Sequence, residues 1–282
     1  MSDRAKRLRE STLEGYRSSL DTHVLPRWGS TEIEDLTPEG LQEWIDGSFP
    51  GIPGGAEKAY KTLRQVIRFA IRKLGVRCWD PTTVGIELPR KRAYRPRTLD
   101  AQGSKTYLRT LWGSEVEAVA ICALTLGLRR GEACGLKWSD IDMRSGEARI
   151  RRSRQWVRGH EVVVDPKTDK SARSCYLPRF ALVRLRQIRR ETGGRGWLCP
   201  LAAHAIARRI RSMCRRAGAE CTSMTNLRHT WATLAIEAGI GIETVALMLG
   251  HSDIGTAYQH YIVPRPTICK EAQQAWQKHL FS

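Results

Sequence analysis

The spacing of apolar residues near the start of the chain predicts a helix. Apolar side chains recur there at intervals of three and four, the period of one helix face: Leu13, Tyr16, Leu20 and Val24. Ser11 is a suitable N-cap, while Pro26 and Gly29 favour an end to the helix. We therefore expect a helix over residues 11–27.

The next two helices have recognisable start and stop signals. Thr37 precedes a proline and an acid, the pattern of an N-cap and first turn. It begins a short helix with Leu41, Trp44 and Ile45 inside. The glycine- and proline-rich residues 51–55 indicate a loop. A longer helix follows over residues 56–74 and is stopped by a glycine.

The 56–74 helix has two different faces. Its apolar face is formed by Tyr60, Leu63, Val66, Ile67, Ala70, Ile71 and Leu74. Its basic face is formed by Lys58, Lys61, Arg64, Arg68 and Arg72. No acid lies between Lys58 and Gly75, whereas a solvated face usually mixes charges. We interpret the basic face as a phosphate-contacting surface, with simple solvation as the alternative.

A change in composition divides the chain into two domains. Residues 86–98 are basic, contain prolines and lack apolar periodicity. This segment is a linker that lies along a phosphate backbone or only tethers the two parts. The expected domains are residues 1–85 and residues 99–282.

The second domain is predicted to be mainly helical with a small sheet. Its expected helices lie near residues 100–112, 116–126, 131–137, 179–192, 202–217, 225–238, 243–249, 252–262 and 267–281. Between residues 147 and 178 the period changes to that of strands. Strands at 147–157, 161–164 and 173–177 would form a three-stranded antiparallel meander. The fold class is thus mainly α: a helical domain followed by an α+β domain.

Composition and charge narrow the range of partners. Of 282 residues, 41% are hydrophobic and 27% are charged, a balance typical of globular proteins. The net charge of +18 indicates a polyanion, with nucleic acid ahead of an anionic membrane. We expect a cytoplasmic protein, because the sequence has neither a membrane-length apolar run nor a signal core.

The eight cysteines do not have metal-binding spacing. No Cys-x-x-Cys pair and no Cys/His cluster occurs among them. We expect them to be reduced, buried and apolar in character, and we expect neither a metal nor a cofactor.

Two arginines have positions that a solvated basic face would not produce. Arg129 follows a turn at the end of an apolar helix, and Arg228 lies within the 225–238 helix beside Leu227 and Trp231. A guanidinium gives paired hydrogen bonds to phosphate oxygens and keeps its charge. Together with a later histidine and tyrosine, they suit phosphodiester transfer with covalent attachment. Each could instead be an arginine of a structural ion pair.

Five motifs in this order resemble those of the tyrosine recombinase (phage integrase) family: Gly127-Leu-Arg-Arg-Gly-Glu, Pro166-Lys-Thr, Asn226-Leu-Arg-His-Thr, Leu249-Gly-His-Ser and Tyr261. The resemblance covers nearly the whole chain. It implies a helical, SAM-like core DNA-binding domain, then the catalytic domain. It also implies a site-specific DNA recombinase, an integrase of a prophage or integrative element, bacterial and nucleoid-associated.

The resemblance implies a role for each residue that matches a motif. Arg129 and Arg228 would clamp the scissile phosphate, with Glu132 supporting Arg129. Lys167, or Lys170 in its place, would protonate the leaving 5′ oxygen.

The remaining matched residues are a histidine and a tyrosine. His251 would hydrogen-bond a non-bridging oxygen of the phosphate. Tyr261, ten positions later, would be the nucleophile that forms a 3′-phosphotyrosyl link, with Tyr258 as its only competitor.

One position departs from the family pattern. Thr225 stands where the family commonly has histidine, and a hydroxyl cannot act as a base near neutral pH. It can still donate a hydrogen bond to phosphate. His229 would lie about 100° away on the helix and is interpreted as structural. The departure suggests one alternative, a DNA-binding relative impaired in catalysis. A type IB topoisomerase, which uses related chemistry, is a second alternative.

The expected partners are duplex DNA attachment sites and other copies of the chain. Further phosphate contacts are expected from the linker and from the 202–217 helix: Arg90, Lys91, Arg92, Arg208 and Arg211. The resemblance implies that a tail helix at 267–281 docks on a neighbouring protomer in a homo-tetramer on two DNA sites. An excision or directionality factor, or a host bending protein, is a further possible partner, and no membrane partner is expected.

Overall fold

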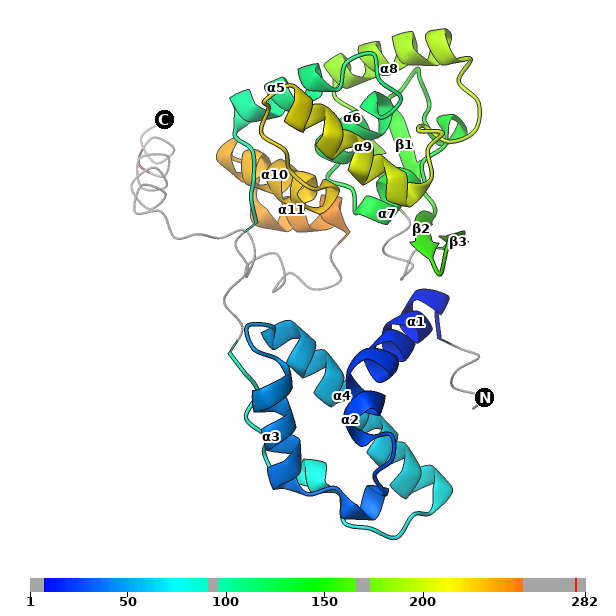
Figure 1. The fold of residues 1–282 in the computed structure, drawn as a ribbon. Coiled ribbons are helices and arrows are strands. Elements are labelled where there is room, and N and C mark those ends of the chain that lie inside the picture. The colour runs from blue at the N-terminus through cyan, green and yellow to red at the C-terminus, as the bar shows by residue number, and fades with distance from the viewer. Residues whose placement is uncertain (1–7, 91–95, 166–172, 251–276, 278–282) are drawn as a thin grey trace. The chain divides into compact units, whose positions relative to one another are not determined.

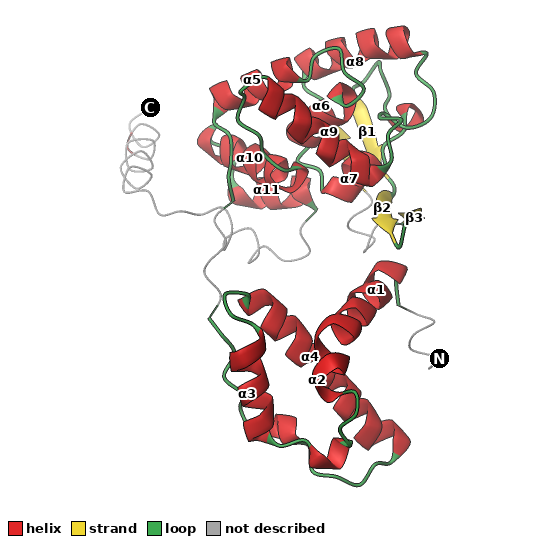
Figure 2. Cartoon of the chain, in the orientation of Figure 1, coloured by secondary structure: helices red, strands yellow, loops and turns green. Residues whose placement is uncertain are grey.

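The computed structural model describes residues 8–90, 96–165, 173–250 and 277. The chain divides into two compact units, Met1–Arg95 and Pro96–Ser282. Both consist mainly of helices, and the strands are antiparallel and lie in the second unit (Figure 2). This confirms the predicted fold class.

The first unit is a small helical assembly around its own core. Its described α-helices are α1 (Glu10–Ser19), α2 (Leu25–Trp28), α3 (Pro38–Ser48) and α4 (Pro53–Phe69). Thr37 caps α3 by accepting a hydrogen bond from the backbone N–H of Gly40, as predicted. Leu41, Trp44 and Ile45 of α3 are buried, which also confirms the prediction. They pack with residues of α4 such as Leu63 in one apolar cluster.

The first predicted helix is interrupted. It begins after Arg9, so Ser11 is not its N-cap. A π-helical turn, Leu20–Val24, joins α1 to α2. Pro26 lies in the first turn of α2 and does not end the helix there, because a first-turn proline has no amide hydrogen bond to lose.

The predicted loop at residues 51–55 is partly wrong, since α4 begins at Pro53. A proline is preorganised for the first turn of a helix. A Cβ added to Gly55 would lie 2.9 Å from Cγ2 of Ile52, so the glycine allows this turn to pack closely.

The later part of this helix ends as predicted but buries fewer side chains than expected. A π-helical turn, Ala70–Leu74, follows α4 and ends at Gly75, whose φ of 73° is left-handed. Val66 and Leu74 are exposed, contrary to the predicted apolar face. Leu74 belongs to the π turn, where the wider helical turn moves its side chain away from the apolar face of α4.

The second unit is built around one buried helix. Its described α-helices are α5 (Ala101–Thr110), α6 (Glu117–Thr125), α7 (Arg130–Cys134), α8 (Arg179–Thr192), α9 (Ala203–Arg216), α10 (Met224–Glu237) and α11 (Ile242–Leu249). Residues 117–124 of α6 are all buried, and α5, α7, α8 and α10 pack around them (Figure 1). A helix apolar on all sides is buried in this way.

The strands differ from the predicted meander. Strand β1 (Glu147–Ile150) pairs with β4 (Arg173–Tyr176), while β2 (Ser153–Val157) pairs with β3 (His160–Val164). The described strands thus form two two-stranded sheets, and the expected strand 147–157 is split.

A tertiary contact accounts for the break between β1 and β2. The guanidinium of Arg152 pairs with Asp140 at 2.5 Å. The backbone beside Arg152 also lies close to α7, since a Cβ added to Gly135 would stand 3.0 Å from the Arg152 carbonyl oxygen. The chain therefore turns toward α7 at this point instead of continuing as a strand.

The cysteines in the described residues are free thiols. Five of them are buried, as expected: Cys122, Cys134, Cys175, Cys199 and Cys214. Burial raises the pKa of Cys134 and of Cys199 to about 11. Cys221 is exposed, which departs from the prediction.

Within the described ranges, the helices are too short or too polar to cross a membrane.

Candidate active site and nucleic-acid interface

The turn before α7 places Arg129 at the beginning of that helix. Gly127 has a left-handed φ of 59°, and an added Cβ would lie 2.7 Å from Cδ2 of Leu249 and 2.9 Å from the ring of Trp231. Only glycine allows this close approach without strain. Leu128 is buried next to it, and Arg129 becomes the N-cap of α7.

Glu132 is bonded to Arg129 through both backbone and side chain. The backbone N–H of Arg129 donates to Oε2 of Glu132 at 3.0 Å, and the guanidinium donates to Oε1 at 2.8 Å. The Glu132 side chain is 7% exposed, whereas that of Arg129 is 45% exposed. The ion pair expected from the one-turn spacing is therefore present, and it leaves the guanidinium accessible to a ligand.

Arg228 is buried inside the second unit. It lies in α10 after Leu227 and hydrogen-bonds two backbone carbonyl oxygens, of Gly127 at 2.9 Å and of Leu249 at 2.9 Å. Its guanidinium thus joins the turn before α7 to the end of α11.

Arg173 belongs to the same group, although we did not identify it from the sequence. It is the first residue of β4, and its side chain is 9% exposed. Its guanidinium donates to Oε2 of Glu132 at 3.1 Å and to Oε1 at 3.4 Å. Its Nε donates to the Met248 carbonyl oxygen at 3.0 Å. The sequence offers only a basic residue at a strand start, which is a weak signal.

The surroundings of Glu132 favour its charged form. Burial raises the pKa of its carboxyl, but the charge and hydrogen bonds of Arg173, with hydrogen bonds from Arg129, outweigh burial. The pKa of Glu132 is therefore lower than usual, and the carboxylate keeps its charge.

The three arginines converge on three consecutive carbonyl groups at the end of α11. Arg173 donates to Met248, Arg228 to Leu249, and Arg129 to Gly250 at 3.2 Å. Three guanidinium groups and one carboxylate give this cluster a net charge of +2. A partly exposed cluster of this kind attracts an anion, and the paired donors of guanidinium suit a phosphate.

Thr225 lies on the surface in the first turn of α10, one turn before Arg228. His229 is half-buried. The other predicted catalytic residues lie outside the described part of the chain: Lys167, Lys170, His251, Tyr258 and Tyr261. Lys167 and Lys170 belong to residues 166–172, which end just before Arg173. His251, Tyr258 and Tyr261 belong to residues 251–276, which begin just after Gly250.

The basic face of α4 is partly neutralised by acids. Lys61 pairs with Glu57 at 2.5 Å, and Arg68 with Asp80 at 3.4 Å. Burial raises the pKa of Asp80, but hydrogen bonds from Thr82 and Arg68 outweigh it and lower the pKa overall.

The remaining basic residues of this face differ in exposure. Arg64 is half-buried, while Lys58 and Arg72 are exposed. Two of the five basic residues of this face, Lys61 and Arg68, are thus paired with acids that lie outside the 58–75 interval, Glu57 and Asp80.

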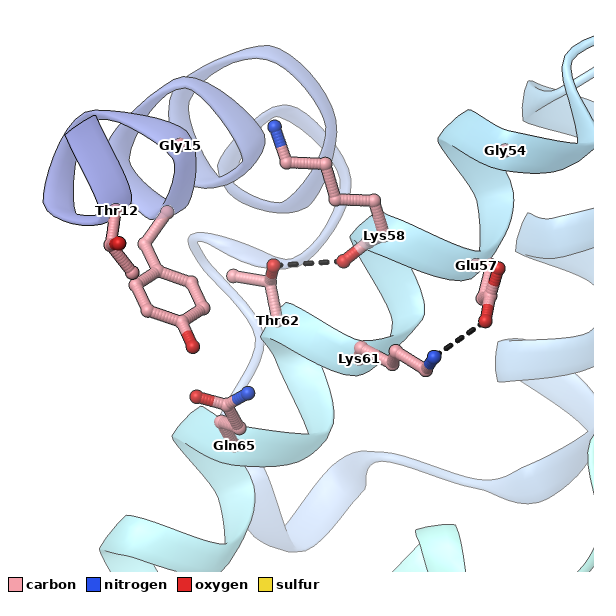
Figure 3. A pocket seen from close by; sticks show the side chains of 9 residues that line it. Thr12, Gly15, Gly54, Glu57, Lys58, Lys61, Thr62 and Gln65 are labelled. Atoms are coloured by element: carbon pink, nitrogen blue, oxygen red, sulfur yellow. Dashed lines mark hydrogen bonds and ion pairs between the residues drawn. The ribbon is translucent and has the colours of Figure 1, made fainter. Parts of the chain in front are cut away.

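A groove lies between α1 and α4 in the first unit, with a volume of about 540 Å³ (Figure 3). Its lining includes Thr12, Tyr16, Lys58 and Gln65, and also the ion pair of Lys61 with Glu57. The Lys58 side chain extends toward α1, where its Nζ would lie 3.9 Å from a Cβ added to Gly15. The groove thus presents an ammonium and several hydrogen-bonding groups to a ligand.

The second unit carries further basic residues on α9. Arg208 and Arg211 are exposed. Arg209, between them in sequence, pairs with Glu115 at 2.8 Å. Arg90 is also exposed, and the predicted contacts Lys91 and Arg92 lie outside the described residues.

Comparison with known proteins gives matches along the chain. The model of the phage integrase family matches residues 116–266, and the model of the phage integrase N-terminal SAM-like domain matches residues 1–48. A putative prophage phiRv2 integrase of Mycobacterium tuberculosis is 27% identical over 90% of this chain and 70% of its own length. The tyrosine recombinase XerC of Xylella fastidiosa is 26% identical over 88% and 85%.

Solved structures show the same fold. The integrase of the Tn1549 transposon, in complex with a circular intermediate DNA, aligns with a TM-score of 0.77 and 16% identity over 95% of this chain and 94% of that chain. A lambda integrase tetramer bound to a Holliday junction aligns with a TM-score of 0.67 and 19% identity over 90% and 72%. The family match alone spans more than half of the sequence, so the chain belongs to the phage integrase family of tyrosine-type site-specific recombinases.

Proposed function

We propose that this recombinase cleaves and rejoins duplex DNA through a 3′-phosphotyrosyl link on Tyr261, and that it integrates and excises a prophage or integrative element. The observation that carries the proposal is the convergence of Arg129, Arg173 and Arg228 on the backbone just before His251. The prophage integrase among its relatives supports the biological role.

Arg129 is the residue of this group best placed to hold the scissile phosphate. Its side chain is 45% exposed and is anchored by Glu132. In the transition state of phosphoryl transfer, charge is spread over the non-bridging oxygens, and a fixed guanidinium stabilises that charge. Arg228, which is buried, fixes the backbone on both sides of the cluster through Gly127 and Leu249.

The remaining steps follow from the residue types. The phenol of Tyr261 gives up its proton to a solvent water, its oxygen forms a bond to phosphorus, and the bond to the 5′ oxygen breaks. Lys167 gives that oxygen its proton, and His251 hydrogen-bonds a non-bridging oxygen. Rejoining reverses these steps: a 5′ hydroxyl displaces the tyrosine, so the cycle consumes no external energy source.

The basic surfaces support binding of the duplex. The α1–α4 groove with Lys58, the exposed Arg90, and Arg208 and Arg211 on α9 would contact phosphates. Since a related integrase was solved as a tetramer on a Holliday junction, we extend the proposal to a homo-tetramer acting on two DNA sites. An excision factor or a host bending protein would set the direction of the reaction.

A covalent adduct tests the proposal. The protein is incubated with a nicked attachment-site substrate whose cleaved strand end diffuses away, and protein–DNA species are resolved on denaturing gels. We expect an adduct with the natural sequence and with Tyr258→Phe, and none with Tyr261→Phe. Absence of an adduct despite demonstrated DNA binding would favour an impaired relative, the alternative that Thr225 raises. Relaxation of supercoils at any sequence would favour a topoisomerase.

A further inference from the structure

The Arg173 side chain connects three parts of the second unit. It lies on β4, which pairs with β1 in the register Ile150↔Arg173. It hydrogen-bonds both carboxylate oxygens of Glu132 on α7 and the carbonyl oxygen of Met248 on α11. These partners are 41 and 75 positions away in the sequence.

We propose that Arg173 is a positioning residue for DNA cleavage: it fixes Glu132, and through Glu132 it fixes the guanidinium of Arg129 at the scissile phosphate. This inference rests on the function proposed above. Arg173 itself, with a side chain that is 9% exposed, acts through Glu132 and not by contact with the DNA.

The geometry at Glu132 explains why a second arginine is needed. Oε1 accepts from the guanidinium groups of Arg129 and Arg173, while Oε2 accepts from the Arg129 backbone and from Arg173. Each oxygen therefore has two donors, which uses the four acceptor positions of a carboxylate. Without Arg173, the carboxylate keeps only its two hydrogen bonds from Arg129, within the same turn of the chain. The support that Glu132 receives from β4 is then lost, and the Arg129–Glu132 pair is held less firmly.

The bond from Arg173 to Met248 fixes the opposite side of the cluster. The next two carbonyl oxygens in the chain accept hydrogen bonds from the other arginines, Leu249 from Arg228 and Gly250 from Arg129. A lysine keeps the charge of Arg173 but cannot form the same planar fork, so it cannot make all three contacts at once.

The experiment measures single-turnover cleavage of the nicked substrate and DNA affinity for Arg173→Ala and Arg173→Lys. We expect affinity to stay within a few-fold and the cleavage rate of Arg173→Ala to fall roughly 100-fold, the scale of a small misplacement of a catalytic group. Arg173→Lys should recover part of this rate. If Arg173→Ala does not fold, Arg173→Lys alone carries the test.

A neutral substrate separates positioning from a general loss of structure. In a methylphosphonate, a methyl group replaces one non-bridging oxygen, so the scissile group has no charge for Arg129 to neutralise. The defect of the Arg173 variants should shrink to a few-fold on this substrate. An equally large defect on both substrates, or no defect on ordinary DNA, would overturn the proposal.

Two further measurements complete the design. Arg152→Ala removes another ion pair of this unit, that of the half-buried Arg152 with the buried Asp140. It is the matched control and should cleave at nearly the natural rate. In a double-mutant cycle, Arg173→Ala combined with Glu132→Gln should be no slower than the slower single variant, because both act through one contact. Additive losses would contradict action through Glu132. Failure of the unmodified protein to form any adduct would instead refute the proposed function.

Discussion

Arg129 donates a hydrogen bond to the carbonyl oxygen of Gly250 across 3.2 Å, although 121 positions separate the two residues in sequence. Gly250 ends α11 in a left-handed conformation with a φ of 66°. This contact ties the start of α7 to the residue that precedes His251. It brings together the motif that begins at Gly127 and the motif that begins at Leu249, through a backbone carbonyl of the second one.

Arg129 and Arg228 are expected to differ in their effect on stability. Arg228→Ala leaves two buried carbonyl groups without their donor, so it should lower the free energy of unfolding by roughly 3 kcal/mol. Arg129→Ala removes a partly exposed side chain and should cost about 1 kcal/mol or less. Urea unfolding measures both values. Adduct formation should be lost in both variants, and equal destabilisation would contradict this assignment.

The stability of the second unit should depend on pH through Glu132. Its pKa is lowered in the folded state, from an ordinary value of 4.5. The folded state therefore binds fewer protons than the unfolded state as the pH falls below that value. The stabilisation by Glu132 is complete above pH 4.5 and is lost as the pH falls through the lowered pKa.

Thermal unfolding of the natural sequence and of Glu132→Gln measures this effect. Glu132→Gln should unfold at the lower temperature near neutral pH, and the difference should narrow in acid. A difference that stays constant through the acid range would show that Glu132 does not titrate as described.

Basic residues of α4 should contribute unequally to DNA binding. Lys58 is exposed beside the groove, so Lys58→Ala should reduce the slope of log affinity against log salt by about 1. Arg68 already pairs with Asp80, and Arg68→Ala should reduce the slope less. Affinity titrations at several salt concentrations give the two slopes. A larger change for Arg68 would indicate that the ion pair opens on DNA.

A substitution at Thr225 is the most direct way to alter transfer of the tyrosine proton. It is exposed in the first turn of α10, so Thr225→His should fold normally. An imidazole there could accept the tyrosine proton near neutral pH, and we expect faster cleavage with a new pH dependence. Rates across pH for the natural sequence, Thr225→His and Thr225→Ala measure this. Identical profiles for all three would place residue 225 outside the site.

Much of the fold follows from local signals. The spacing of apolar residues predicts α8 and nearly predicts α9, α10 and α11, because one face of each is buried against the domain. Thr37 and Gly75 mark helix ends through side-chain capping and left-handed backbone, which are properties of the residue and its neighbours.

Long-range contacts explain where local signals were insufficient. The break between β1 and β2 depends on the ion pair of Arg152 with Asp140. On the basic face of α4, Arg68 is neutralised by Asp80, which lies after the end of that helix. Neither partner can be selected from sequence spacing, since many acids lie within a similar number of positions.

The sequence by itself determined the helical class, the order of the motifs and the choice of Arg129, Glu132 and Arg228 as candidates. Motif order and residue type are properties of the sequence, and they can be identified without the distances between residues in the folded protein. Only the tertiary structure decided that Arg173 shares Glu132 with Arg129. It also decided that three arginines meet three successive carbonyl groups, because such contacts depend on how separate helices and strands pack together.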